Sequence, residues 1–123
     1  MLGYVTIGTN DMEKGKAFWG TLLELLGYKK IADMGRMALF GCGAGKPMLG
    51  VCVPYDEGDP QPGNGNMLAF VAGSRANVDE YYKKALELGG TDEGPPGERS
   101  PTFYGAYFRD IDGNKVVFYH SGK

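Results

Sequence analysis

The sequence predicts one α+β domain that is built from two βαβββ modules. Two observations support this fold class. The order strand, helix, glycine and further strands occurs first over residues 1–54 and again over residues 66–123. Between these modules, residues 55–65 hold almost no apolar side chain and are rich in proline and glycine, which is typical of a linker. The length of 123 residues suits a single domain with a buried core.

The first module begins with residues 3–8, a short run rich in β-forming residues that predicts a strand. Apolar residues at helical spacing then predict an amphipathic helix over about 12–26. Asn10 or Asp11 is placed to cap this helix, and Gly27 is placed to end it in the left-handed conformation. Short strands separated by glycine-rich turns are predicted to follow near 28–33, 35–42 and 47–54.

The second module repeats this order. A strand is predicted at 66–72 and a helix at 76–89, with Ser74 or Asn77 as its cap. Residues 93–101, EGPPGERSP, are predicted to form a loop because of their prolines and glycines. The module then closes with two strands joined by an Asp-Gly hairpin turn, at 103–110 and 115–120.

The two modules align with each other, which favours an internal duplication. The strand YVTIG at 4–8 matches MLAFV at 67–71 at an offset of 63, and Leu26-Gly27 matches Leu88-Gly89 at an offset of 62, so one gap covers strand and helix together. A repeated unit of this kind is a strong guide to the fold of a whole chain.

Charge and composition bear on the partners and location. Thirteen basic and 15 acidic residues leave a net charge of -2, which gives no electrostatic reason to expect nucleic acid or a membrane as partner. No apolar run approaches the roughly 20 residues of a spanning helix, and the N-terminus does not resemble a signal peptide, so we expect a cytoplasmic protein. Cys42 and Cys52 form no metal motif, and two buried thiols are favoured over a disulfide.

Three segments carry a family resemblance: VTIGTNDMEKGKAFW at 5–19, GNGNMLAFVA at 63–72 and YGAYFRDIDGNKVVF at 104–118. They resemble signatures of the vicinal oxygen chelate superfamily, which includes glyoxalase I, bleomycin-resistance proteins, fosfomycin-resistance enzymes and extradiol dioxygenases. The closing DxDGN segment is the most specific part. The resemblance implies modules with curved mixed sheets that bind ligands on their concave faces, and for a chain of this length it implies a homodimer.

The resemblance also implies where metal ligands would lie, at the start of each opening strand and in the closing strands. Those positions correspond to Tyr4, Met67 and Val117, and residues 34–55 contain no Asp, Glu or His. A phenol, a thioether and an isopropyl group are poor ligands for divalent Fe, Zn, Ni or Mn, so we expect neither a metal nor another cofactor. The only histidine, His120, lies three residues beyond Val117 and therefore on the opposite strand face.

Without a metal, the concave face would be an apolar pocket carrying one phenol, which suits an aromatic or amphipathic small organic molecule. The alternative is that the same residues fill a closed core. The predicted pocket residues are Tyr4, Thr6, Arg36, Met67, Ala69, Tyr107, Arg109 and Val117. Arg36 and Arg109 are candidate anchors for an anion, although an exposed surface arginine is the simpler interpretation of each. The pattern leaves open which face of strand 103–109 is concave.

The predicted function is a metal-independent, ligand-binding member of the glyoxalase and bleomycin-resistance group, with no catalytic residue assigned. Three alternatives stay open: a metal-independent lyase or isomerase using Tyr4 or Tyr107 as acid–base, a metal-dependent glyoxalase or dioxygenase, and a structural domain without a site. Trp19 is predicted to pack in the core or an interface, and Asp110 and Asp112 are interpreted as turn residues.

Overall fold

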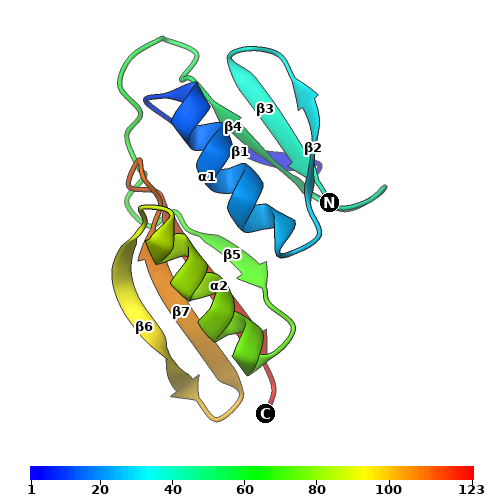
Figure 1. Cartoon of the computed structure of the whole chain (residues 1–123), viewed down its shortest axis with the longest axis vertical. Coiled ribbons are helices and arrows are strands. Elements are labelled where there is room, and N and C mark those ends of the chain that lie inside the picture. The colour runs from blue at the N-terminus through cyan, green and yellow to red at the C-terminus, as the bar shows by residue number, and fades with distance from the viewer. The chain divides into compact units, whose positions relative to one another are not determined.

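The computed structural model describes all 123 residues, which form two compact units. The first unit is Met1–Gln61 and the second is Pro62–Lys123, so the boundary falls inside the segment predicted to be a linker. Each unit places one helix against one face of a four-stranded sheet (Figure 1). Neither helix has the length and apolar character needed to cross a membrane.

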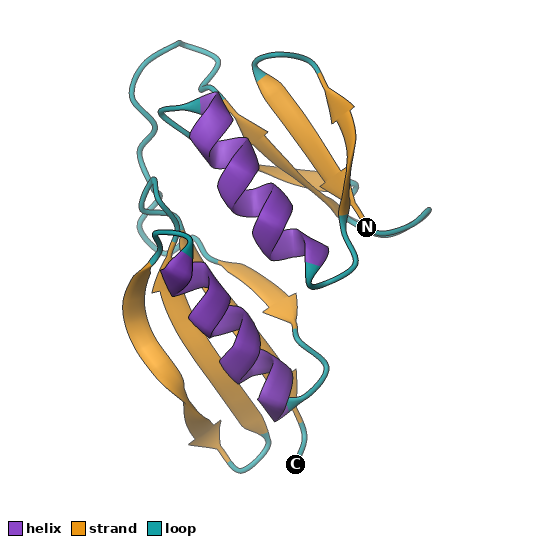
Figure 2. Cartoon of the chain, viewed as in Figure 1, coloured by secondary structure: helices purple, strands orange, loops and turns teal.

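The first unit has βαβββ topology. Its elements are β1 Tyr4–Gly8, α1 Met12–Glu24, β2 Lys29–Asp33, β3 Met37–Gly41 and β4 Met48–Cys52. The strand order across its sheet is β1-β4-β3-β2, in which β1 and β4 are parallel and the remaining pairs are antiparallel (Figure 2). The long connection through α1 is what allows two parallel strands to become neighbours.

The second unit has the same topology. Its elements are β5 Leu68–Val71, α2 Arg75–Glu87, β6 Thr91–Ser100, β7 Phe103–Arg109 and β8 Lys115–Ser121. The sheet order is β5-β8-β7-β6, again with a parallel pair, β5 and β8, next to antiparallel pairs. The predicted α+β fold of two βαβββ modules with mixed sheets is therefore confirmed.

The prediction of a loop at 93–101 is wrong, because most of this segment belongs to β6. Strand β6 pairs with β7 despite Pro95 and Pro96, which have no N–H group to donate. Two features of the sheet accommodate them. Strand β6 lies at the sheet edge, where one side needs no ladder partner, and its register with β7 shifts at three places.

Side-chain caps and glycines fix the ends of both helices. Asp11 caps α1 by accepting a hydrogen bond from the Lys14 backbone N–H at 3.1 Å, and Ser74 caps α2 in the same way from Asn77 at 3.0 Å. Gly27 has a φ of +83°, the left-handed conformation predicted for it. The sequence left two candidates for each cap, and the structure selects Asp11 and Ser74.

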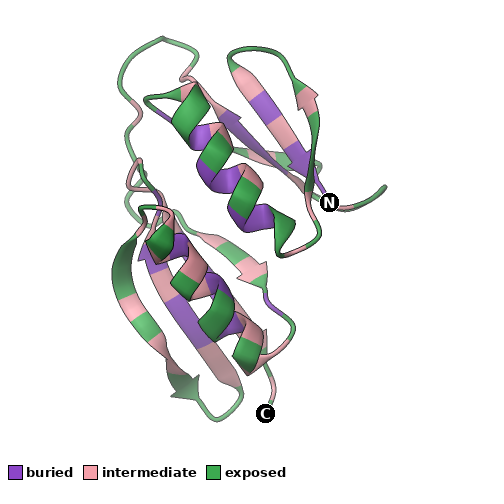
Figure 3. Ribbon diagram, viewed as in Figure 1, coloured by how far each residue is buried: buried purple, intermediate pink, exposed green.

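The core of each unit lies between its helix and its sheet (Figure 3). In the first unit Trp19 is 1% exposed and packs edge-to-face on Phe18 at 5.3 Å, which confirms core packing for Trp19. In the second unit Phe118 occupies the centre, in contact with three other rings.

Two glycines inside α1 differ in the space beside them, and this gives a first testable prediction. A Cβ at Gly15 would lie 2.8 Å from Oγ1 of Thr9, a 2% exposed residue, whereas a Cβ at Gly20 would lie 3.5 Å from the Phe40 ring. Alanine is about 1 kcal/mol more favourable than glycine within a helix. We therefore expect Gly20→Ala to raise the free energy of unfolding by about 0.5–1 kcal/mol.

Gly15→Ala gains the same helix propensity but overpacks Thr9. Its free energy of unfolding is expected to fall about 1–3 kcal/mol below that of Gly20→Ala. Urea denaturation followed by the fluorescence of Trp19, the single tryptophan, reports this difference for the first unit. Equal stability of the two variants would contradict the packing described beside Gly15.

Candidate functional site

Each sheet has one face covered by its helix and an opposite face that its helix leaves uncovered, here called the open face. In the first unit, alternate residues such as Ala38, Leu49 and Val51 are buried beneath α1. The residues between them point the other way, because side chains alternate along a strand. The first open face consists of Tyr4, Thr6, Ile31, Met37, Leu39, Met48, Gly50 and Cys52. Lys29 on the edge strand β2 pairs with Gly41, whose Cβ position lies beside Ile31 and Met48, so the register also places one cation at the edge of this face.

The open face of the second unit is identified in the same way. Tyr104 faces α2, where its hydroxyl donates to the Asp79 carboxylate at 2.7 Å, and Phe108 is fully buried. The alternate residues of β7 and their partners on β5 and β8 form the second open face: Ala69, Val71, Phe103, Gly105, Tyr107, Arg109, Lys115, Val117 and Tyr119. The orientation that the sequence left open for strand 103–109 is thereby settled.

Four predicted pocket residues are accessible beside or on the open faces. Tyr4 is 53% exposed at the start of β1, and Thr6 follows it on the same face. Met67 precedes β5 and is 45% exposed, and Ala69 is an exposed residue of that strand. These residues lie in or beside the opening strands of the two units, where the family resemblance placed Tyr4 and Met67.

Val117 and Arg36 lie differently from the other predicted pocket residues. Val117 faces the open side but is only 1% exposed, and a Cβ at the neighbouring Gly105 would lie within 3.4 Å of both Val117 and Phe103. At this position the alternative of a filled core describes the structure better. Arg36 lies in the turn between β2 and β3, where its guanidinium donates to the Val53 carbonyl at 3.0 Å and stacks over the Tyr55 ring.

Cations surround Tyr107 on the second open face. Arg99 lies 5.4 Å and Lys115 5.6 Å from the centre of the Tyr107 ring. Arg109 forms an ion pair with Glu93 at 3.2 Å and donates to the Gly113 carbonyl. Sequence reasoning missed Arg99 because its segment was predicted to be a loop, and it missed Lys115 although this residue pairs with Arg109 across the hairpin.

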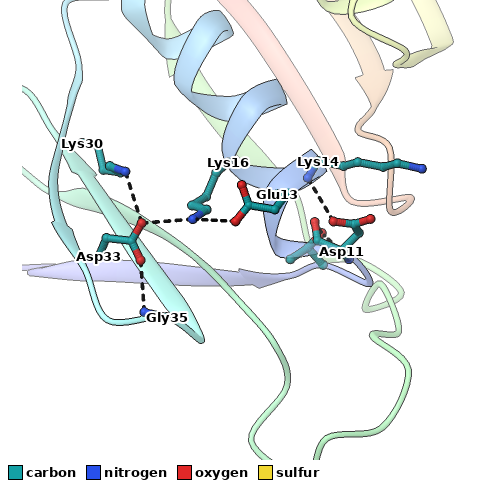
Figure 4. A network of polar contacts seen from close by, with 8 residues as sticks. Asp11, Glu13, Lys14, Lys16, Lys30, Asp33 and Gly35 are labelled. Atoms are coloured by element: carbon teal, nitrogen blue, oxygen red, sulfur yellow. Dashed lines mark hydrogen bonds and ion pairs between the residues drawn. The ribbon is translucent and has the colours of Figure 1, made fainter.

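A separate groove of about 660 Å³ lies between α1 and β2, on the helix side of the first sheet. Figure 4 shows the polar network beside it, in which the Asp33 carboxylate accepts from the Gly35 N–H and from Lys16 and Lys30. The Gly35 hydrogen bond and then the two ammonium groups hold the pKa of Asp33 well below its usual range. Because Lys16 also pairs with Glu13, its cation is balanced by carboxylates of the same network.

Asp110 has a structural role in the hairpin turn between β7 and β8, and the two cysteines are free thiols. Asp110 is 4% exposed, and its carboxylate accepts from the backbone N–H groups of Asp112 and Asn114 within the hairpin turn. This confirms Asp110 as a turn residue. Cys42 and Cys52 are free and partly buried, so the prediction of two thiols is confirmed.

The two βαβββ modules define the class of protein, and comparison with known families agrees. Residues 1–118 match the model of the Glyoxalase/Bleomycin resistance protein/Dioxygenase superfamily. The chain therefore belongs to this superfamily, as the sequence motifs predicted. No curated protein matches the chain.

Solved structures resemble the chain over nearly its whole length. A glyoxalase/bleomycin resistance protein from Albidiferax ferrireducens T118 shares 34% identity, with a TM-score of 0.87 and 98% of each chain covered. A family enzyme from Burkholderia phytofirmans PsJN has 21% identity, a TM-score of 0.75 and 95% coverage of each chain. The lactoylglutathione lyase of Agrobacterium tumefaciens has 22% identity and a TM-score of 0.69, with 97% of this chain and 92% of that chain covered. The last two similarities concern the fold alone.

The side chains at the expected ligand positions do not fit the divalent metal that the superfamily implies. Tyr4 and Met67 offer a phenol and a thioether, and Val117 offers no donor and is buried. Nowhere in the structure do three or more His, Cys, Asp or Glu residues come together in an arrangement that could hold a metal ion. His120 pairs with Tyr104 and so lies on the helix side of β8, away from Val117. These donors are unsuited to Fe, Zn, Ni or Mn.

Proposed function

We propose that the protein binds a small organic molecule on the open faces of its sheets, as a metal-independent member of the glyoxalase and bleomycin-resistance group. The observation that carries this proposal is the exposure of large apolar and aromatic side chains there. Ile31 is 56% exposed on the first open face and Val71 is 65% exposed on the second. Tyr4 adds to the exposed apolar surface of the first unit and Met67 to that of the second, and exposed apolar surface of this kind marks a ligand or partner site.

The side chains of the first open face are suited to recognise a small organic ligand by its shape. A Cβ at Gly50 would lie 3.1–3.3 Å from Thr6, Met37 and Leu39, so these side chains surround a position that has no side chain of its own. Methionine side chains adapt to irregular shapes and make favourable contacts with aromatic rings. The Tyr4 phenol and the Thr6 hydroxyl each add a hydrogen-bond donor and acceptor to a mostly apolar surface.

We further propose that a second copy of the chain covers these faces and encloses the ligand. Exposed apolar surface is unfavourable in water, and burying it stabilises by about 25 cal/mol for each Å². Native mass spectrometry is expected to find a metal-free dimer of about 27 kDa, twice the 13.3 kDa chain. Retention of one divalent Ni, Zn, Mn or Fe ion for each site would contradict metal-independent binding.

The free thiols support a reducing, cytoplasmic location.

Substitutions on the open faces test the proposed function. Tyr4→Ala removes an aromatic contact and Met67→Glu introduces a charge into an apolar site. Each is expected to weaken binding of the fluorescent probe 8-anilinonaphthalene-1-sulfonate by about tenfold, or 1.4 kcal/mol. Leu25→Glu is the control, because Leu25 is 37% exposed but lies at the end of α1, away from the open faces. Unchanged affinity in both open-face variants would show that the assignment of the site is wrong.

A further inference from the structure

We infer that the second open face selects an aromatic carboxylate, whose anionic group binds beside Tyr107 and is attracted by Arg99 and Lys115, the two cations close to that ring. This inference rests on the proposed function and adds the chemical class of the ligand. The two cations come from β6 and β8, the strands on either side of β7, and both converge on the ring of Tyr107.

Neither cation has a carboxylate partner. The guanidinium of Arg99 donates to the Pro95 carbonyl, and its remaining donors form no other hydrogen bond or ion pair. Lys115 also forms no ion pair. The acidic side chains nearby are already engaged, because Glu93 pairs with Arg109 and Glu98 pairs with Arg75. Two like charges held beside one ring repel each other, and a bound anion would remove this repulsion.

Glycines hold the guanidinium of Arg99 close to the strand. A Cβ at Gly97 would lie 2.7 Å from Nη1 of Arg99, and a Cβ at Gly94 would lie 3.3 Å from Nη2. Any larger residue at Gly97 would displace the guanidinium. A guanidinium has five N–H donors in a planar fork. The Arg99 guanidinium donates to one carbonyl, that of Pro95, and therefore retains donors for the carboxylate of a ligand.

The same face also provides an aromatic surface for the rest of the ligand. Phe103 stacks on Tyr119 with ring centres 5.2 Å apart and planes 7° from parallel. Both belong to the second open face, and Tyr119 lies two residues beyond Val117, the partner of Tyr107. In the proposed complex, a flat ligand places its ring on this stack and its carboxylate near the two cations. On the first open face the register places a single cation, Lys29, on the edge strand, whereas the second open face has two cations beside one ring, so we expect charge selectivity at the second.

A matched pair of probes tests the inference on the full chain. We expect 2-naphthoate to bind at least about tenfold more tightly than neutral 2-naphthamide in titration calorimetry, with an advantage that falls as salt rises. Arg99→Gln and Lys115→Gln are each expected to weaken naphthoate binding about three- to tenfold and naphthamide binding by a smaller factor, because the neutral amide forms only an ordinary hydrogen bond with these groups. Arg75→Gln is the control, because Arg75 stacks on Tyr104 at 5.1 Å on the helix side of the sheet.

The outcomes separate this inference from the proposed function. Equal binding of naphthoate and naphthamide would overturn the inference and leave the proposed function standing. If neither probe binds, both are overturned. If Arg75→Gln lowers naphthoate affinity as much as Arg99→Gln does, the placement of the anion beside Tyr107 is wrong. Circular dichroism of each variant establishes that a lost affinity does not reflect a lost fold.

Discussion

Phe118→Ala is expected to lower the free energy of unfolding of the second unit by about 3–5 kcal/mol. Phe118 is fully buried, and its ring contacts Phe70, Tyr81 and Phe108 at centre distances of 5.9, 5.6 and 5.3 Å. These partners come from β5, α2 and β7, so the ring joins the helix to the sheet. Its removal would leave a cavity at that junction.

The measurement is urea denaturation followed by circular dichroism, together with hydrogen exchange of the amides in β8. Phe118→Leu is the matched control, because it retains most of the buried volume and is expected to lose less than about 1.5 kcal/mol. A loss below about 1 kcal/mol in Phe118→Ala would mean that the cavity collapses, and that the four rings do not form one tightly packed cluster.

The repeat in the sequence predicted both modules because local signals mark the helix ends. The caps Asp11 and Ser74 are 63 residues apart, whereas the stop glycines Gly27 and Gly89 are 62 apart. Both stops use the same hydrogen bonding, in which the residue after the glycine donates to a carbonyl five residues earlier. Both helices have 13 residues and their C-caps, Leu25 and Leu88, are still 63 apart, so the single gap lies after the helix, between the C-cap and the stop glycine.

Strand β6 could not be predicted from its own residues. Its sequence contains two prolines and two glycines, which locally favour a loop. It forms a strand because β7 offers an unpaired edge, and an edge strand with irregular register tolerates residues that a central strand does not. That interaction is tertiary, and no pattern within residues 93–101 signals it.

Only part of the candidate site could be predicted from the sequence, because one of its residues lies on β6. Strand alternation placed Tyr4, Thr6, Tyr107 and Arg109 on common faces, which the structure assigns to the open sides. Arg99 was missed because its position over Tyr107 depends on β6. Alternation also does not report burial, and Val117 illustrates this. The Val117 side chain points to the open face, as expected, but neighbouring side chains cover it.

Asp110→Ala is the second substitution with a large expected effect. One oxygen of the buried Asp110 carboxylate accepts from the Asp112 N–H at 2.9 Å and the Asn114 N–H at 2.8 Å. The other oxygen accepts from the Asn114 side-chain amide at 2.9 Å. Alanine would leave these donors without an acceptor in a partly buried turn, and we expect a loss of about 2–4 kcal/mol in the free energy of unfolding.

Asp110→Asn tests how much of this loss comes from the backbone hydrogen bonds. The asparagine amide oxygen can still accept from both backbone N–H groups. This variant is expected to lose about half as much as Asp110→Ala in urea denaturation. If both variants are as stable as the original chain, the turn is held by its backbone hydrogen bonds and by Gly113, at its φ of +89°, and the Asp110 carboxylate does not contribute. Because the turn sets the register that pairs Arg109 with Lys115, Asp110→Ala is also expected to reduce the preference for naphthoate over naphthamide. A preference that survives a loosened turn would mean that Lys115 does not hold the anion.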